Sequence, residues 1–330
     1  MKCLIRYFPK LHKKDSTFVV PNSVRTIDVS AFRECKHLEE VIIPDEVTSI
    51  GRWVFEECKK LKRIALPKKL NDFGQLAFYD CSSLSEVIMP STLESIELMT
   101  FGGCDSLHSI YIPGAIRSID NAFGLSICEF VVSPQNKHFA SIDGVLYNKK
   151  KTILIEMPRG RKLTEFTIPD GVKEIRYEAF RCYDTLKHVA FPRGLKRIGP
   201  SAFWGCNSLL EADLPDGINF ISEEAFMDCK ALKSVKLPKG LKSIGNNAFR
   251  GCDNLTSITI PPSVYDIGSA ALPMKLKELH VSYKDLKNTC PNYYPFSENE
   301  ENTILYVPKG TKEMYKNNET FGDFLNIVEE

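Results

Sequence analysis

The segment from Leu38 to Cys58 reads LEEVIIPDEVTSIGRWVFEEC. Its first part alternates apolar and polar residues and ends at Pro44. This is typical of a strand with one buried face, because proline has no N–H to donate to a sheet. A second apolar pair leads to Gly51, and the segment closes with Phe55 three residues before the cysteine. Almost every part of this pattern returns along the chain, so the segment is one unit of an internal repeat.

The repeat has a step of 23 residues. Prolines that close an apolar run keep this step in two series, which are Pro21, Pro44, Pro67, Pro90 and Pro113, then Pro169, Pro192, Pro215, Pro238 and Pro261. Phenylalanines keep it at Phe32, Phe55, Phe78 and Phe101, then at Phe180, Phe203, Phe226 and Phe249, with Leu272 in the last unit. Seven cysteines follow such a phenylalanine by three residues: Cys35, Cys58, Cys81, Cys104, Cys206, Cys229 and Cys252. This register predicts a solenoid, in which each unit buries its apolar side only by stacking on its neighbours.

Each unit is predicted to hold a strand, a turn, a second extended segment and a short corner. Gly51, Gly199, Gly245 and Gly268 follow the second apolar pair, where we expect a chain reversal that needs permissive dihedral angles. The Ala-Phe-x-x-Cys element suits one or two helical turns, or an irregular corner, because it is too short for a long helix. The predicted fold class is α/β, a solenoid with a parallel β-sheet on one face and short helical or irregular corners.

The repeat resembles the BspA-like leucine-rich-repeat family. The likeness rests on the pattern Leu-x-x-Ile-x-Ile-Pro-x-x-Val-x-x-Ile-Gly, matched from Leu255 to Pro261 and by Val264, Ile267 and Gly268, and on the Ala-Phe-x-x-Cys corner. It covers nearly the whole chain, although the asparagine ladder of the usual leucine-rich pattern is not met. The resemblance implies a leucine-rich-repeat solenoid. It also implies a microbial surface protein, since many members are surface-exposed and some are adhesins.

We expect a single leucine-rich-repeat solenoid over residues 1–330, with regular repeats at 1–122 and 163–282. The step breaks at 123–162, where residues 143–147, 148–151 and 152–155 read as strand, turn and strand, so a hairpin insert is predicted. Residues 283–330 are expected to form a cap, with a strand at 303–307 and an amphipathic helical pattern from 309 onward. Its predicted apolar contacts are Met314, Tyr315, Phe321, Phe324, Leu325 and Ile327.

The first residues look like the interior of a repeat. Leu4 to Pro9 matches Leu154 to Pro158 of the irregular insert, so we expect that the true start lies upstream or that the chain is a fragment. These residues contain neither the apolar core nor the cleavage site of a secretory signal. Two locations are therefore expected: the cell surface or secretion, which the resemblance implies, and the cytoplasm, which the N-terminus taken literally indicates.

Composition and motifs exclude several classes of protein. Lys and Arg total 43 against 42 Asp and Glu, a formal net charge of +1, so no nucleic-acid partner is expected. No run approaches the ~18 apolar residues of a membrane span, so no direct membrane insertion is expected. Phosphate-loop, dinucleotide-binding, nucleophile-elbow and His-Glu-x-x-His motifs are all missing. We therefore expect no enzyme and no cofactor.

The 11 cysteines are expected to pack rather than to react. Equivalent residues of stacked units lie about 5 Å apart, but their side chains point the same way, whereas a disulfide needs Cβ atoms that face each other. The periodic thiols should therefore form a buried ladder. Cys104 and His108 are among the nearest approaches to a zinc-ligand pair and have no second pair at zinc spacing, so no metal is expected. Four cysteines lie off register and leave their redox state open: Cys3, Cys128, Cys182 and Cys290.

Strand alternation predicts which residues face outward. With Leu38, Val41 and Ile43 buried, positions 40 and 42 of that unit point to the opposite face. The column at position 40 is acidic, with six glutamates in eleven units: Glu40, Arg63, Glu86, Ser109, Glu129, Glu165, His188, Glu211, Ser234, Ser257 and Glu278. The column at position 42 is apolar in its first five members and mostly polar afterwards: Ile42, Ala65, Ile88, Tyr111, Val131, Thr167, Ala190, Asp213, Lys236, Thr259 and His280.

The candidate ligand-binding site joins the apolar members of the second column to neighbouring glutamates. It consists of Glu40, Ile42, Ala65, Glu86, Ile88, Tyr111, Glu129 and Val131. A contiguous exposed apolar strip marks a contact site more often than scattered residues do. The alternative is that β-branched and aromatic residues merely suit strands. We predict a monomeric interaction or adhesion module that binds a protein or glycan; an intracellular protein-interaction scaffold is the alternative function.

Overall fold

The computed structural model describes residues 3–4, 16–283, 285–286 and 300–330. Three features of the sequence analysis lie outside the described part: residues 5–9, which were matched to the irregular insert, the residue Cys290 and the side chain of Cys3. The chain divides into two compact units. Unit 1 comprises Met1–Lys150 and Pro158–Arg161, and unit 2 comprises Lys151–Met157 and Lys162–Glu330. The division falls inside the irregular insert, and a single solenoid across it stays a prediction.

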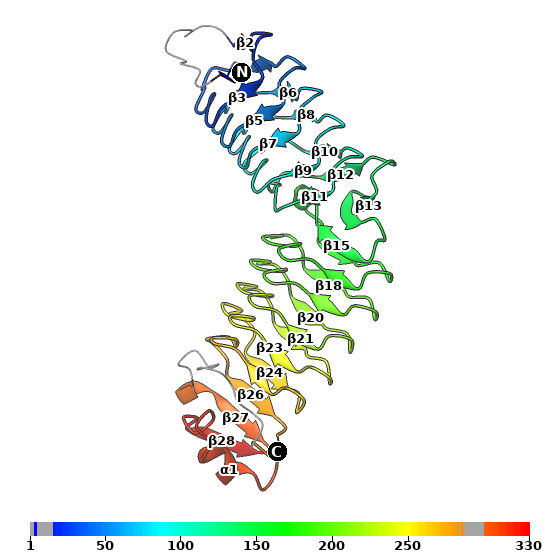
Figure 1. Cartoon of the computed structure of the whole chain (residues 1–330). Helices are drawn as coiled ribbons and strands as arrows, with labels where there is room; N and C mark the ends of the chain where they lie inside the picture. The colour runs from blue at the N-terminus through cyan, green and yellow to red at the C-terminus, as the bar shows by residue number, and fades with distance from the viewer. Residues whose placement is uncertain (1–2, 5–15, 284, 287–299) are drawn as a thin grey trace. The chain divides into compact units, whose positions relative to one another are not determined.

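Unit 1 is a stack of turns that each contribute two short strands, drawn from blue to green in Figure 1. The first ladder precedes the repeat's proline and contains β2 (Thr17–Val19), β4 (Glu40–Ile42), β6 (Arg63–Ala65) and β8 (Glu86–Ile88), followed by the pair β10 (Ser109–Ile112) and β12 (Glu129–Val132). The second ladder follows the proline and contains β1 (Cys3–Leu4), β3 (Thr26–Ile27), β5 (Ser49–Ile50) and β7 (Asp72–Phe73), then the pair β9 (Ser95–Ile96) and β11 (Ser118–Ile119). These strands pair in parallel with a register of one repeat, as Ser49 does with Asp72, which confirms the predicted stacking.

Unit 2 repeats this arrangement. Its first ladder contains the pairs β16 (Glu165–Thr167) with β18 (His188–Ala190) and β20 (Glu211–Asp213) with β22 (Ser234–Lys236), then β24 (Ser257–Ile260) and β26 (Glu278–Val281). Its second ladder contains β15 (Ile153–Glu156), β17 (Glu174–Ile175) and β19 (Arg197–Ile198), then β21 (Phe220–Ile221), β23 (Ser243–Ile244) and β25 (Asp266–Ile267). The 3₁₀ segments are η1 (Arg159–Arg161) in unit 1 and η2 (Glu300–Asn302) in unit 2.

The corners are irregular turns, so the helical alternative is wrong for the described repeats. Two residues of a corner, four positions apart, have a positive φ, for example Trp53 and Glu57 at 54° and 57°. A left-handed residue cannot continue a right-handed helix, so the Ala-Phe-x-x-Cys element bends around the core instead of coiling. Glycine occupies the second of these positions at Gly103, Gly205 and Gly251.

Gly51 and its equivalents have a different role from the one expected. Their φ angles lie outside the left-handed region, so no unusual backbone conformation requires glycine there. A Cβ at Gly51 would instead meet the backbone nitrogen of Val29 at 2.5 Å, and one at Gly199 would meet that of Tyr177 at 2.5 Å. Glycine is needed because the backbones of neighbouring turns approach each other closely at this point.

The core consists of the periodic phenylalanines and cysteines, which are buried as predicted. Phe55 and Phe78 stack with ring centroids 5.3 Å apart, and Phe180 and Phe203 with centroids 4.6 Å apart. Each thiol from the second onward donates a hydrogen bond to the carbonyl oxygen of the phenylalanine one repeat earlier, at 3.0–3.1 Å: Cys58 to Phe32, Cys81 to Phe55, Cys104 to Phe78, Cys206 to Phe180, Cys229 to Phe203 and Cys252 to Phe226. The described cysteines named in the ladder are free thiols, which agrees with packing.

The insert and the cap depart in part from expectation. Both expected insert strands exist, as β14 (Val145–Asn148) and β15, and β14 pairs antiparallel with β13 (Phe139–Ile142), a strand that the sequence did not indicate. The cap is a short helix, α1 (Lys312–Lys316), and a strand, β28 (Asn326–Glu329), parallel to β27 (Ile304–Val307). A helical pattern from 309 to 330 is therefore wrong. Leu325, which a helix would place beside Phe321, is 71% exposed. No helix of the described residues is long and apolar enough to cross a membrane.

Candidate functional site

The first ladder of unit 1 carries the expected exposed apolar strip. Ile42, Ile88, Tyr111 and Val131 are 49%, 57%, 49% and 40% exposed, and Ala65 is exposed as well. They lie side by side because their strands are in register: Ala65 pairs with Ile88, and Tyr111 pairs with Val131. Strands β8 and β10 are in contact, so the two groups are neighbours.

One member of this strip was missed in the sequence. Val19 of β2 pairs with Ile42 and is 61% exposed, so the apolar strip comprises Val19, Ile42, Ala65, Ile88, Tyr111 and Val131. Val19 lies one repeat before Ile42, and this spacing alone could have identified it.

The glutamates beside the strip are not equivalent. The carboxylate of Glu40 lies 3.5 Å from the guanidinium of Arg63 on the next turn, so its charge is offset. Glu86 and Glu129 are exposed and form no ion pair within the described residues. The acidic edge of the strip is therefore concentrated at Glu86 and Glu129, whereas the sequence predicted three equal acidic neighbours.

The same columns in unit 2 are chemically different. The residues of unit 2 that are equivalent to residue 42 are mostly polar, as the pair of Asp213 and Lys236 shows. The described apolar strip therefore ends within unit 1. One position-40 glutamate of unit 2 has an ionisable neighbour: the carboxylate of Glu211 lies 3.1 Å from the imidazole of His188 on the preceding turn. The acidic column predicted over the whole chain is therefore broken by cationic or ionisable partners in both units.

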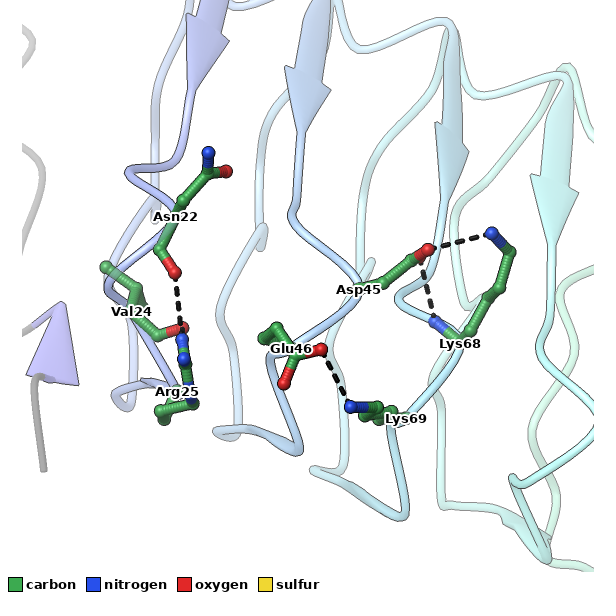
Figure 2. Close-up of polar contacts among 7 residues, drawn as sticks. All are labelled: Asn22, Val24, Arg25, Asp45, Glu46, Lys68 and Lys69. Atoms are coloured by element: carbon green, nitrogen blue, oxygen red, sulfur yellow. Dashed lines mark hydrogen bonds and ion pairs between the residues drawn. The ribbon is translucent and has the colours of Figure 1, made fainter.

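Charged residues one repeat apart pair between turns, which the sequence analysis did not anticipate (Figure 2). The ammonium of Lys68 lies 2.8 Å from the carboxylate of Asp45, and that of Lys69 lies 2.7 Å from the carboxylate of Glu46. Hydrogen bonds from Lys68 lower the pKa of the Asp45 carboxyl, and the hydrogen bond from Lys69 lowers the pKa of Glu46. A 23-residue spacing between opposite charges was the available signal.

The second ladder of unit 1 holds a shallow open depression lined by Arg52, Asn71, Asp72, Phe73, Gly74, Gln75, Ser95 and Glu97. Its two carboxylates already accept hydrogen bonds from neighbouring hydroxyls, Asp72 from Ser49 at 2.7 Å and Glu97 from Ser95 at 2.6 Å. No three potential metal ligands gather anywhere in the described part of the chain. The apolar strip with Glu86 and Glu129 stays a predicted ligand-binding surface.

Two of the off-register cysteines, Cys128 and Cys182, have described positions. Cys182 has φ 55° and occupies the left-handed position that Gly205 takes on the next turn. The ladder position beside it belongs to Tyr183, which is buried and accepts a hydrogen bond from the backbone N–H of Leu163 at 3.0 Å. Cys128 is partly exposed at the start of β12. Neither thiol lies in the apolar strip.

Comparisons with known proteins agree with this fold. A family model described as "BspA type Leucine rich repeat region (6 copies)" matches residues 10–126 and 158–276. The pneumococcal vaccine antigen PcpA is 27% identical, with a TM-score of 0.84 over 99% of this chain and 83% of that chain. A leucine-rich repeat protein from Bacteroides ovatus is 25% identical, with a TM-score of 0.61 over 97% of this chain and 85% of that chain.

A leucine-rich repeat protein from Eubacterium ventriosum, 24% identical with a TM-score of 0.53 over 75% of this chain and 86% of that chain, shares the fold. No curated protein matches the sequence. The family model covers well over half of the chain, in both units, and its repeat is the one that builds the described ladders. The chain therefore belongs to the BspA-type leucine-rich-repeat family.

Proposed function

We propose that this protein is a non-enzymatic binding module and that the apolar strip of unit 1 contacts a protein partner. The observation that carries this proposal is the continuity of the strip: six apolar residues occupy equivalent positions on neighbouring strands, and five of them are at least 40% exposed large side chains. An exposed apolar surface of this kind has unfavourable contact with water that a partner removes.

The chemistry of the strip favours a protein over a glycan. Val19, Ile42 and Ile88 offer aliphatic surface with no hydrogen-bonding group, so a sugar ring laid there would leave its hydroxyls unsatisfied. The unpaired carboxylates of Glu86 and Glu129 lie along one side of the strip. The partner is therefore expected to present alternating apolar side chains with Lys or Arg at the edge, since complementary charge fixes register and speeds encounter.

A display experiment tests this proposal with a defined probe. A phage library of random peptides is selected on the intact chain, and the affinity of the enriched peptides is then measured by calorimetry. We expect peptides that combine apolar and basic residues, with binding at least about tenfold weaker to an Ile88→Ser/Tyr111→Ser variant, because central interface residues dominate affinity.

The matched control replaces an exposed aliphatic residue and an exposed tyrosine outside the strip. Val328 and Tyr265 of unit 2 are 43% and 55% exposed, so Val328→Ser/Tyr265→Ser removes comparable groups from the surface. This variant is expected to bind the selected peptides as the unchanged chain does. Equal binding by the Ile88→Ser/Tyr111→Ser variant, with an unchanged circular dichroism spectrum, contradicts the proposal.

We also propose that the strip meets its partner at the cell surface or after secretion. The family resemblance and the description of the similar PcpA as a vaccine antigen support this location. Antibody labelling of intact cells that express the protein is expected to detect it. Labelling only after permeabilisation favours the intracellular scaffold instead.

A further inference from the structure

The turns that join the two ladders in unit 2 carry five cations that form no ion pair with any described residue. We define the basic edge as Lys173, Arg193, Lys196, Lys239 and Lys242, which occupy two equivalent positions just after the repeat's proline. All five are exposed. Their side chains form no ion pair or hydrogen bond within the described residues. The carboxylates on the same edge are those of Asp170 and Asp216, which likewise form no ion pair there.

The corresponding edge of unit 1 shows that the fold does not require unpaired cations. There Lys68 pairs with Asp45 and Lys69 pairs with Glu46 (Figure 2). Arg117 likewise pairs with Glu94 one repeat earlier. Arg25 donates to the backbone carbonyl oxygens of its own turn at 2.8 and 3.0 Å. Unit 1 therefore neutralises its turn edge internally, whereas the basic edge of unit 2 keeps its charge available to a ligand.

The cations are arranged in lines. The backbone N–H of Lys196 donates to the carbonyl oxygen of Lys173 at 2.8 Å, and that of Lys242 donates to the carbonyl oxygen of Asn219 at 2.7 Å. Equivalent residues of successive turns therefore lie about one strand spacing apart, ~4.8 Å. Over four turns the basic edge extends for about 15 Å. Arg193 and Lys239 share one row with Asp170 and Asp216, and Lys173, Lys196 and Lys242 share the other row with Asn219.

The residues between the two rows include glycines, which have no side chains. Each of the four turns has glycine there, namely Gly171, Gly194, Gly217 and Gly240. A Cβ would find no atom within 4 Å at Gly240 and nothing closer than 3.6 Å at Gly194 and 3.9 Å at Gly171, so packing does not exclude a side chain at these three sites. At Gly217 a Cβ would come within 2.5 Å of the backbone carbonyl oxygen of Leu195 and 3.0 Å of the ammonium of Lys196, so a side chain is excluded there and the ammonium lies beside this glycine. The two rows therefore flank a line of glycines that contribute no side chains of their own, with the ammonium of Lys196 beside Gly217.

We propose that the basic edge binds a linear anionic polysaccharide that carries sulfate or carboxylate groups. A chain of spaced anions matches this edge because its five cations outnumber its two aspartates, and none of these side chains forms an ion pair among the described residues. Single-stranded nucleic acids are bound on aromatic platforms that stack successive bases. No aromatic side chain lies between the rows in these described turns. The exposed Tyr265 stands at the end of the lysine row and the 40% exposed Phe220 follows Asn219, so two separate rings border the edge instead of a stacking series.

The test uses heparin of defined length as the probe and measures its dissociation constant for the full chain by calorimetry at low and at physiological salt. We expect binding that weakens as salt screens the charges. An Arg193→Gln/Lys239→Gln/Lys242→Gln variant is expected to bind at least about tenfold more weakly, since each cation near an anionic surface contributes to affinity.

The matched control is Lys62→Gln/Lys68→Gln/Lys69→Gln, which removes three cations of unit 1 that are already paired with carboxylates. Its net charge equals that of the first variant, and its heparin affinity is expected to stay within about twofold of the unchanged chain. Equal losses in both variants, or no heparin binding by the unchanged chain, overturn the proposal. Tighter binding of an oligothymidylate, or of phosphatidylserine vesicles, than of heparin overturns the assignment to a polysaccharide.

Discussion

Phe78 lies between two other phenylalanines in the core of unit 1, with its ring centroid 5.3 Å from that of Phe55 and 5.7 Å from that of Phe101. It is fully buried, so Phe78→Ala is expected to leave a cavity and to lower the free energy of unfolding by about 3–5 kcal/mol. Urea unfolding followed by circular dichroism measures this change. Phe78→Leu retains more volume and is expected to lose less. A loss below about 1 kcal/mol for the alanine variant contradicts the stacked core.

Three buried ladder thiols, Cys81, Cys104 and Cys229, are expected to resist alkylation in the folded chain. Burial raises the pKa of Cys81 and Cys229 well above its ordinary value and that of Cys104 to about 12, and only the thiolate reacts. Iodoacetamide at about pH 8, followed by peptide mass spectrometry, is expected to modify the partly exposed Cys128 and Cys182 before these three ladder thiols.

The raised pKa of Cys104 also makes the free energy of unfolding depend on pH. A group whose pKa is higher in the folded state contributes stability that is fully present below its unfolded pKa of 9.0 and is lost as the pH rises toward about 12. The free energy of unfolding is therefore expected to fall across this alkaline range. Alkylation of Cys104 as fast as Cys182, or a flat stability profile in that range, contradicts a buried, protonated ladder.

At the scale of the turn, close backbone packing predicts opposite effects at two glycines. A Cβ at Gly199 would lie 2.5 Å from the backbone nitrogen of Tyr177, so Gly199→Ala is expected to cost about 1–3 kcal/mol of stability. Gly240 has no atom within 4 Å of such a Cβ and no left-handed φ. Gly240→Ala is therefore expected to leave stability unchanged or to raise it by up to about 1 kcal/mol. Thermal unfolding of both variants measures the contrast, and equal effects contradict it.

In the whole molecule, stacking leaves every turn with the same outward positions, so surface chemistry can change along the chain while the core stays the same. The first ladder is apolar in unit 1 and polar in unit 2. The turn edge is neutralised in unit 1 and cationic in unit 2, with a formal net charge of only +1 for the chain. The two proposed surfaces lie on different units and different sides of the repeat, so each can be altered without changing the other.

The repeat period by itself determined the parallel ladders, the buried phenylalanines and cysteines, and the outward column that contains Ile88 and Tyr111. It does so because a stack with a fixed step brings residues one repeat apart together, whatever the details of each turn. The local spacing of apolar residues predicted secondary structure less reliably where packing between turns imposes another conformation. The Ala-Phe-x-x-Cys element and the segment after Lys309 have helical spacing, but positive φ angles in the corners and pairing of β28 with β27 exclude a continuous helix.

Only the tertiary structure decided which charges are free and why certain glycines are required. Glu40 and Glu86 are equivalent in the sequence, yet Glu40 lies 3.5 Å from Arg63 and Glu86 forms no ion pair among the described residues. Gly199 and Gly240 are likewise both glycines in turns, and only the first lies against a neighbouring backbone. Such differences depend on side-chain reach and on backbone distances of a few tenths of an ångström between turns, which residue spacing does not contain.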